Sequence, residues 1–302
     1  ATAATTLTLK GGNAIDVVTQ VTTNSTAGIT VDGSGLTAQA AGTTTMDLDT
    51  VAAGAGATVT ITGSGGDDIF GDSTAGVNTT LATTINAGAG VDSIFTGAGA
   101  DTINGGAGKD TINSGAGNDT IDGGADDDTI DMSGNLTNAD VIDGGEGTDT
   151  LTVNNTDVTT VAAYSLGQIA TLNGNISNVE ELNFGTTLAQ TIDVGRLDNI
   201  SIATIGNLAG ASGLSGLAAA NDVTITATTG QTLSLALADA TGTADVVNVN
   251  LKASAVVNGN TITINGVETV NIAGTDAAAG NVSAINVLAL ASDKATSVVV
   301  TG

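Results

Sequence analysis

The feature that most constrains the fold of this chain is a repeat with a period of nine residues. Residues 87–131 divide without a gap into five units, and each unit carries Asp at its sixth place and Ile at its eighth. The units read AGAGVDSIF, TGAGADTIN, GGAGKDTIN, SGAGNDTID and GGADDDTID. A fixed period of this kind means that each repeat stacks on the next, so the sequence predicts a solenoid with its core between neighbouring coils.

Two further units flank this array across short gaps. TGSGGDDIF occupies residues 62–70 and GGEGTDTLT occupies residues 144–152, with Asp67 and Asp149 at the sixth place. Both units also carry Ile or Leu at the eighth place. We therefore expect three parts in the chain, namely a β-rich segment over 1–61, the repeat region over 62–152 and β-rich modules over 153–302.

The residues of one unit suit calcium. This ion takes six to eight hard oxygen donors at about 2.3–2.6 Å and accepts both carboxylates and backbone carbonyls. Glycine permits positive φ, so the carbonyls of the turn can face one point, and the sixth-place carboxylate completes the set. Magnesium is the weaker alternative because it prefers strict octahedral geometry, and zinc would want the His and Cys that this chain lacks. The predicted ligands are Asp67, Asp92, Asp101, Asp110, Asp119, Asp128 and Asp149, with the turn glycines Gly88, Gly90, Gly97, Gly99, Gly106, Gly108, Gly115, Gly117 and Gly124.

One circuit of such a coil takes two units, so equivalent aspartates stack at every second unit. Asp92, Asp110 and Asp128 then lie along one edge, and Asp101 and Asp119 lie along the other. Carboxylates stacked at the strand spacing of about 4.8 Å repel one another by a few kcal/mol at an effective dielectric of about 20. The eighth-place isoleucines contribute about 2–3 kcal/mol each, which does not offset an ordering cost of about 1–2 kcal/mol per residue. Folding of the array is therefore expected to depend on several calcium ions.

Some units depart from the pattern. Asp126 stands at a fourth place where the other units have Gly, and Ala87, Thr96 and Ser114 stand at the first place. We therefore expect the turn 123–128 to form the least regular site of the array.

The flanking regions indicate further strands. In 153–302 apolar residues alternate with Thr, Asn and Ser at a period of two, which is typical of half-buried strands. Residues 176–184 resemble residues 264–272 at an offset of 88 residues, which predicts modules of that length. The Ala- and Gly-rich stretch 208–220 is interpreted as a loop with room for a short helix over 213–220. The expected fold class is all-β, with a parallel β-roll (a β-solenoid) flanked by β-rich solenoid or sandwich-like modules.

Charge and composition exclude several classes of partner. The chain has 31 acidic and 5 basic residues and a formal net charge of −26, which disfavours nucleic acid and anionic headgroups and favours divalent cations. The absence of Cys excludes a disulfide framework. The sequence has no apolar run of 18 residues, so we expect no membrane span.

The tandem G-G-x-G-x-D units resemble the RTX family of calcium-dependent proteins exported by type I secretion. Residues from Leu235 to Gly302 are similar to RTX surface-layer (S-layer) proteins of the Caulobacter type. This resemblance implies an extracellular protein of the bacterial cell surface that assembles with copies of itself into a lattice or filament. It also leaves room for contact with cell-surface polysaccharide through a region outside this chain.

Two other functions stay open beside a self-assembling surface layer. One is an RTX adhesin or stalk module that presents a binding domain. The other is a polysaccharide-active enzyme, for which Glu180, Glu181 and Glu268 are the candidate carboxylates. Because the chain has no His, it offers neither an H-E-x-x-H zinc site nor a Ser-His-Asp triad, and we expect no catalysis.

Overall fold

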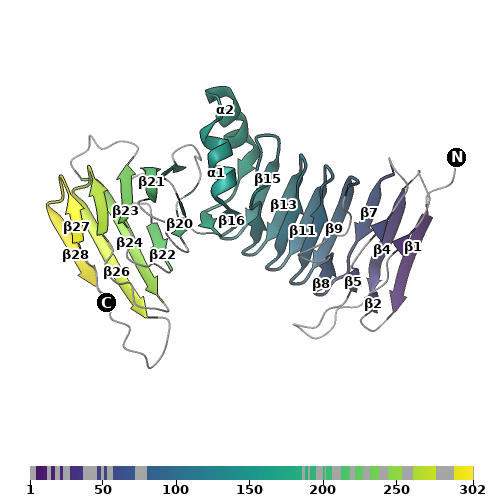
Figure 1. Ribbon diagram of the computed structural model, residues 1–302. Helices are drawn as coiled ribbons and strands as arrows, with labels where there is room; N and C mark the ends of the chain where they lie inside the picture. The colour runs from purple at the N-terminus through teal and green to yellow at the C-terminus, as the bar shows by residue number, and fades with distance from the viewer. Residues whose placement is uncertain are drawn as a thin grey trace. The chain divides into compact units, whose positions relative to one another are not determined.

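Most of the residues that the structure describes belong to parallel β-strands (Figure 1). The structure, a computed structural model, contains two α-helices among the residues it describes. These residues are 5–11, 15–17, 21–22, 28–36, 46–48, 51–52, 57–71, 80–185, 188–189, 191–194, 200, 202–205, 212–217, 222–226, 232–237, 244–253, 261–276 and 289–301. Neither helix is long and apolar enough to cross a membrane.

The chain divides into two compact units. The first comprises residues 1–151 and 170–179, and the second comprises residues 152–169 and 180–302. Each unit is described by itself below.

The first unit is a roll of two facing parallel sheets. One sheet has the strand order β1 (Thr5–Gly11), β4 (Ile29–Leu36), β7 (Val59–Thr62), β9 (Thr83–Ala89), β11 (Thr102–Ala107), β13 (Thr120–Ala125), β15 (Val141–Glu146) and β17 (Ile176–Ser177). The other has the order β2 (Ile15–Val17), β5 (Met46–Leu48), β8 (Asp68–Phe70), β10 (Ser93–Gly97), β12 (Thr111–Gly115), β14 (Thr129–Asp131) and β16 (Thr150–Val153), of which β16 runs across the division. A short parallel pair, β3 (Val21–Thr22) and β6 (Val51–Ala52), lies outside these sheets. From β7 to β17 successive strands alternate between the two sheets, which confirms the predicted parallel β-roll.

The eighth-place isoleucines form the core of the roll. Ile103 pairs with Ile85 and Ile121 in one sheet, and Ile112 pairs with Ile94 in the other. All are buried, together with Ile130. Because β-strand side chains alternate between faces, the flanking Thr and Asn side chains point outward. The core is therefore one isoleucine wide on each sheet, as the sequence predicted.

The second unit holds helix α1, the start of helix α2 and a further set of parallel strands. The helices are α1 (Asn155–Ala162) and α2 (Leu166–Asn175), the latter crossing the division at residue 170. One run of strands has the order β18 (Glu181–Phe184), β20 (Ile202–Ile205), β22 (Asp222–Ile225), β24 (Val246–Ala253), β26 (Thr269–Asp276) and β28 (Ser297–Thr301). A second sheet has the order β19 (Thr191–Asp193), β21 (Ser212–Leu217), β23 (Thr232–Leu237), β25 (Thr261–Asn265) and β27 (Ala289–Ser292).

Helix α1 starts at a capping box. The Asn154 side chain accepts hydrogen bonds from the backbone N–H groups of Thr156 and Asp157 at 2.7 and 3.4 Å, and the Asp157 carboxylate accepts one from Asn154 N at 2.8 Å. Two orphan donors of the first turn are satisfied in this way. The pattern Asn-x-x-Asp was a signal for a helix start that the sequence interpretation passed over.

The short helix considered over 213–220 is wrong for the described residues 213–217, which belong to strand β21. Leu214 and Leu217 are both buried although they are three residues apart, a spacing that suggests a helix. Gly216 has a φ of 71°, and the register of β21 against β23 shifts between the two leucines. A bulge thus returns both side chains to the core of a strand.

The motif repeated at an offset of 88 residues has one conformation in both copies. A residue with positive φ ends a strand, Asn178 at 51° and Gly266 at 78°. A buried valine follows each, Val179 and Val267. The second strands of the two copies, β18 and β26, lie four strands apart in one parallel run.

Candidate metal centre

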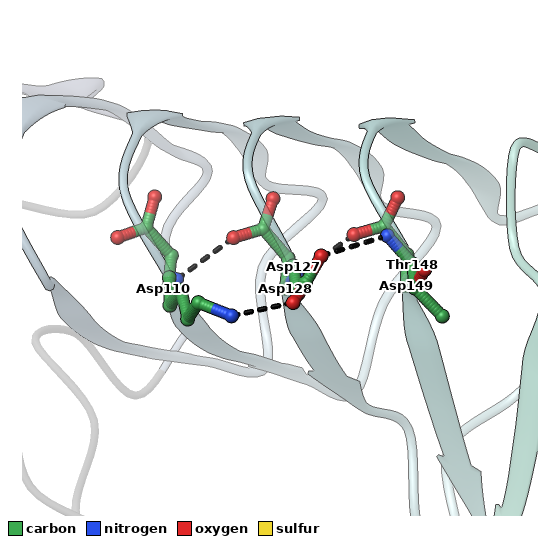
Figure 2. A network of polar contacts seen from close by, with 6 residues as sticks. Asp110, Asp127, Asp128, Thr148 and Asp149 are labelled. Carbon is green, nitrogen blue, oxygen red and sulfur yellow. Dashed lines mark hydrogen bonds and ion pairs between the residues drawn. The ribbon is translucent and has the colours of Figure 1, made fainter.

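The sixth-place aspartates stack in two columns along the roll. Each of them directly precedes the residues of a strand and is buried. In the first column Asp92 N donates to Asp110 Oδ1 at 2.8 Å and Asp110 N donates to Asp128 Oδ1 at 2.8 Å. Asp128 N donates to Asp149 Oδ1 at 2.8 Å. Figure 2 shows the carboxylates of Asp110, Asp128 and Asp149 on successive coils, side by side and pointing the same way. One oxygen of every carboxylate thus holds the backbone of the preceding coil.

The second column has the same ladder. Asp101 N donates to Asp119 Oδ1 at 2.9 Å, and Thr83 N donates to Asp101 Oδ1 at 2.7 Å. At the other end Asp119 N donates to Asp140 Oδ1 at 2.9 Å. Asp140 is therefore a column residue that the nine-residue period missed.

An insertion places Asp140 outside the nine-residue period. It follows Asp119 by 21 residues, whereas Asp101 and Asp119 are 18 apart. A local signal was present, because Val141-Ile142-Asp143-Gly144-Gly145 after it resembles the residues after Asp119. Its Oδ2 accepts hydrogen bonds from Thr137 N at 2.7 Å and Thr137 Oγ1 at 3.1 Å. Protein donors thus satisfy the last carboxylate of this column.

The assignment of Asp67 to the sixth place is wrong by one residue. Strand β8 pairs with β10 so that Phe70 lies beside Ile94, which aligns Asp68 with Asp92. Accordingly Asp68 N donates to Asp92 Oδ1 at 2.7 Å, and Phe70 is buried. A shift of one residue exchanges the two faces of a strand, and the adjacent pair Asp67-Asp68 left that choice open in the sequence. Asp67 instead accepts a hydrogen bond from Val91 N at 2.9 Å.

The second oxygen of the column carboxylates is the strongest indication of a cation. This atom, Oδ2, is buried and has no hydrogen-bond partner in Asp92, Asp101, Asp110, Asp119 and Asp128. A buried acceptor left without a partner costs about 1–3 kcal/mol. Oxygens that point into a turn and lack a donor are suited to a hard cation.

Burial also disfavours the charge on these carboxylates. Burial is the main cause that raises the pKa of Asp92 to about 8, and the neighbouring carboxylates of Asp110 and Asp68 add to it. For the same main reason the pKa rises to about 6 in Asp110, to about 6 in Asp119 and to about 7 in Asp128. A bound divalent cation reverses this balance because it favours the ionised form.

First-place glycines keep space open beside Oδ2. A Cβ built on Gly105 would lie 2.5 Å from Asp110 Oδ2 and 2.5 Å from the carbonyl oxygen of Gly123. A Cβ on Gly123 would lie 2.6 Å from Asp128 Oδ2 and 2.4 Å from the carbonyl oxygen of Gly144. Each cradle therefore brings together one carboxylate oxygen and a carbonyl from the next coil. These first-place glycines were absent from the predicted ligand set.

The predicted second- and fourth-place glycines allow the turns to stack. A Cβ on Gly106 would lie 1.9 Å from the carbonyl oxygen of Gly88, and one on Gly108 would lie 1.8 Å from that of Gly90. Gly97 has a φ of 141°. A similar approach to a backbone atom of an adjacent coil is made by Gly88, Gly90, Gly99, Gly115, Gly117 and Gly124. Their role as carbonyl ligands stays a prediction.

The oxygen atoms beside these aspartates are a mixture of carboxylate and backbone carbonyl oxygens, and this mixture suits calcium. Within the described part of the chain, no three Asp, Glu, His or Cys residues gather at one point. Each cradle offers one carboxylate oxygen per turn together with backbone carbonyls, and calcium accepts that mixture. Asp110 with Gly123, and Asp128 with Gly144, are the pairs that would hold the ion in the first column.

The second column carries side chains at the first place instead of glycine. Thr96 and Ser114 are buried there, and Thr96 Oγ1 donates to the carbonyl oxygen of Ser114 at 2.8 Å. Ser114 Oγ in turn approaches Met132 Sδ at 3.4 Å. The two columns thus present different surroundings to their carboxylates.

A further polar row lies at the exposed fifth place. Lys109 pairs with Asp127, whose Oδ1 accepts a hydrogen bond from Thr148 N at 3.0 Å (Figure 2). The hydrogen bond from Lys109 is the main cause that holds the pKa of Asp127 below its usual value. This row links successive coils outside the buried column.

Asp126 has a positive φ, as the fourth-place glycines Gly90, Gly108 and Gly147 do. Its φ is 79°, and its carbonyl oxygen would lie 2.2 Å from a Cβ on Gly147 of the following coil. The irregular turn expected at 123–128 therefore retains the stacking seen in the other turns. Aspartate tolerates this left-handed region better than branched side chains do.

We expect Asp126→Val to lower the unfolding free energy of the calcium-loaded chain by about 1–2 kcal/mol, because a β-branched side chain opposes positive φ. Asp126→Gly should retain wild-type stability or exceed it. The measurement is urea unfolding in saturating calcium. Asn118→Val is the matched control, since Val91 already occupies the same fifth place in another unit. Equal stability of the Val and Gly variants at 126 would show that the conformation carries no cost.

Comparison with known protein families identifies the repeat. Residues 79–112, 104–131 and 137–155 match the family described as RTX calcium-binding nonapeptide repeat (4 copies). No curated protein matches the chain. RTX nonapeptide repeats bind several calcium ions and are typical of secreted proteins. The array is therefore a calcium-binding parallel β-roll.

Proposed function

We propose that this calcium-binding chain is a structural subunit of a surface layer or sheath that assembles outside the bacterial cell. The parallel coils, the buried carboxylate columns and the RTX repeats support a secreted protein whose body is ordered by calcium. The S-layer resemblance of the sequence extends this to a self-assembling lattice or filament.

The observation that carries assembly is strand β28. Among the described strands it pairs only with β26, from Thr269↔Ser297 to Ala273↔Thr301. All five of its residues are exposed, with exposed fractions of 47% for Val298, 45% for Val299 and 72% for Val300. Exposed valine side chains on a strand form an apolar surface that another protein surface can cover. We assign that contact to a second copy of the chain.

Charge explains why assembly would need calcium. The formal net charge of −26 makes copies of the chain repel one another. Calcium bound in the columns reduces this charge while it orders the roll. We therefore expect assembly and folding of the array to respond to the same ion.

The candidate catalytic carboxylates have structural contacts that favour a non-enzymatic role. Glu181 Oε1 accepts a hydrogen bond from Thr204 Oγ1 at 2.6 Å, between neighbouring strands. Glu268 Oε2 accepts one from Asp245 N at 3.2 Å. We assign these residues to strand and turn stabilisation.

The test is negative-stain imaging of the purified chain with calcium and with chelator. We expect sheets or filaments in calcium and dispersed particles in chelator. Val300→Lys should abolish assembly because a charged side chain would have to be buried against the second copy. Leu166→Lys is the control, since Leu166 is an exposed apolar residue on helix α2. Single particles in calcium for the unaltered chain would contradict the proposal and favour the adhesin or stalk module.

A further inference from the structure

The first column ends in one more glycine cradle, at Gly144 and Asp149 of the last matched repeat. A Cβ built on Gly144 would lie 2.7 Å from Asp149 Oδ2 and 1.9 Å from the carbonyl oxygen of Asn178. The carboxylate is buried. The arrangement repeats the cradles at Gly105 and Gly123, where the carbonyl comes from the equivalent first place one coil further on. Here the carbonyl comes from a residue that lies outside the matched repeats.

Asn178 reaches this position after a long excursion of the chain. Helices α1 and α2 intervene, and the chain then returns as β17, which pairs with β15 in parallel through Ile142↔Ile176 and Asp143↔Ser177. Continuing that register places Asn178 beside Gly144. Strand β17 is only two residues long, so few backbone hydrogen bonds hold the returning segment.

Asn178 has a backbone conformation that is unusual for a residue other than glycine. Its φ is 51°, and Asp126 is the only other described non-glycine residue with positive φ. Its side-chain Nδ2 donates a hydrogen bond of 2.7 Å to Oδ1 of Asp143, the residue directly before Gly144. The buried Val179 follows directly. The side chain and the following core residue together hold the Asn178 carbonyl over the cradle.

We propose that the Asn178 carbonyl oxygen and Asp149 Oδ2 belong to one further calcium site at the end of the first column. An ion at this site joins the last repeat to β17 and so fixes the segment that returns from the two helices. The ligand class is a hard divalent cation, as in the preceding cradles. The carbonyl of Asn178 thus takes the position that the carbonyl of a first-place glycine has in the preceding coils, although residues 176–184 do not follow the nine-residue pattern.

Two pairs of variants test the site. Gly144→Ala puts a methyl group between the two oxygens, whereas Gly174→Ala, on helix α2, meets nothing within 4 Å and is its control. Asn178→Val opposes the positive φ that orients the carbonyl, whereas Asn178→Gly keeps that φ accessible. Both variants at 178 lose the hydrogen bond to Asp143. The difference between them therefore reports on the backbone conformation that orients the carbonyl.

The measurements are calcium stoichiometry by isothermal titration calorimetry and hydrogen exchange of residues 176–179 in calcium. Gly144→Ala and Asn178→Val should each bind one calcium ion fewer than their controls. They should also lose protection at 176–179 while 87–131 stays protected, which shows that the roll is still folded. The proposal is overturned if both variants bind as much calcium as the controls, or if Asn178→Gly loses as much as Asn178→Val.

Discussion

Removing calcium at pH 8 is expected to unfold the repeat array, residues 87–131, while the strands of the second unit persist. Without the ion, the buried Oδ2 atoms of the five array aspartates have neither a donor nor a cation, and stacked carboxylates carry like charges. The second unit is held by buried apolar residues such as Val249 and Ile264 on paired strands. Circular dichroism should lose only part of its strand signal, and limited proteolysis should cut the array first.

Lower pH should partly replace the ion. The pKa of Asp92 is raised to about 8 and that of Asp128 to about 7 in the folded chain, above their ordinary value of 3.8. A carboxyl whose folded pKa is raised contributes stability that is complete below about 3.8 and is lost as pH rises through 6 to 8. In chelator, the array should therefore be more resistant to proteolysis at pH 5 than at pH 8. Equal cutting at both values would contradict the role assigned to the buried carboxylates.

The second large effect is expected from Asp110→Ala. Asp110 lies in the middle of the first column, where its Oδ1 accepts from Asp92 N and its Oδ2 borders the Gly105 cradle. The variant removes a calcium ligand and leaves the buried N–H of Asp92 without an acceptor, a loss of about 3 kcal/mol in calcium-loaded stability. Calcium titration and urea unfolding measure the two consequences.

Asp92→Ala is expected to cost less calcium than Asp110→Ala. The first place of its unit is Ala87, which is buried. Its methyl group stands at the place where Gly105, in the unit of Asp110, leaves space open. Asp122→Ala, on the exposed face of β13, is the control for loss of charge alone. If Asp92→Ala released as much calcium as Asp110→Ala, the glycine cradle would have no part in binding.

The array could be predicted from the sequence because the length of the repeat sets the number of residues in one coil. Two nine-residue units make one coil, so the columns through Asp110 and Asp119 followed from counting. Insertions broke this reasoning, since Asp140 lies three residues out of phase. At the other end, the adjacent acids Asp67 and Asp68 left the register open until the burial of Phe70 decided it.

Contacts between segments that are far apart in the chain could not be predicted from the sequence. Nothing local indicates that the carbonyl of Asn178 meets Gly144, because the contact depends on how two helices return the chain to the roll. Strand β21 shows the same limit at short range, since the bulge at Gly216 decides whether leucines three residues apart belong to a helix or a strand.

Hydrogen exchange with and without excess chelator tests most directly whether the array folds with its metal. In calcium, the amides that pair the coils through Ile94, Ile103, Ile112 and Ile121 should be strongly protected. In chelator at pH 8, protection across 87–131 should be lost while that of β24 and β26 remains. Protection of 87–131 that survives chelation would show that the roll folds without calcium, and the account given for its carboxylate columns would then be wrong.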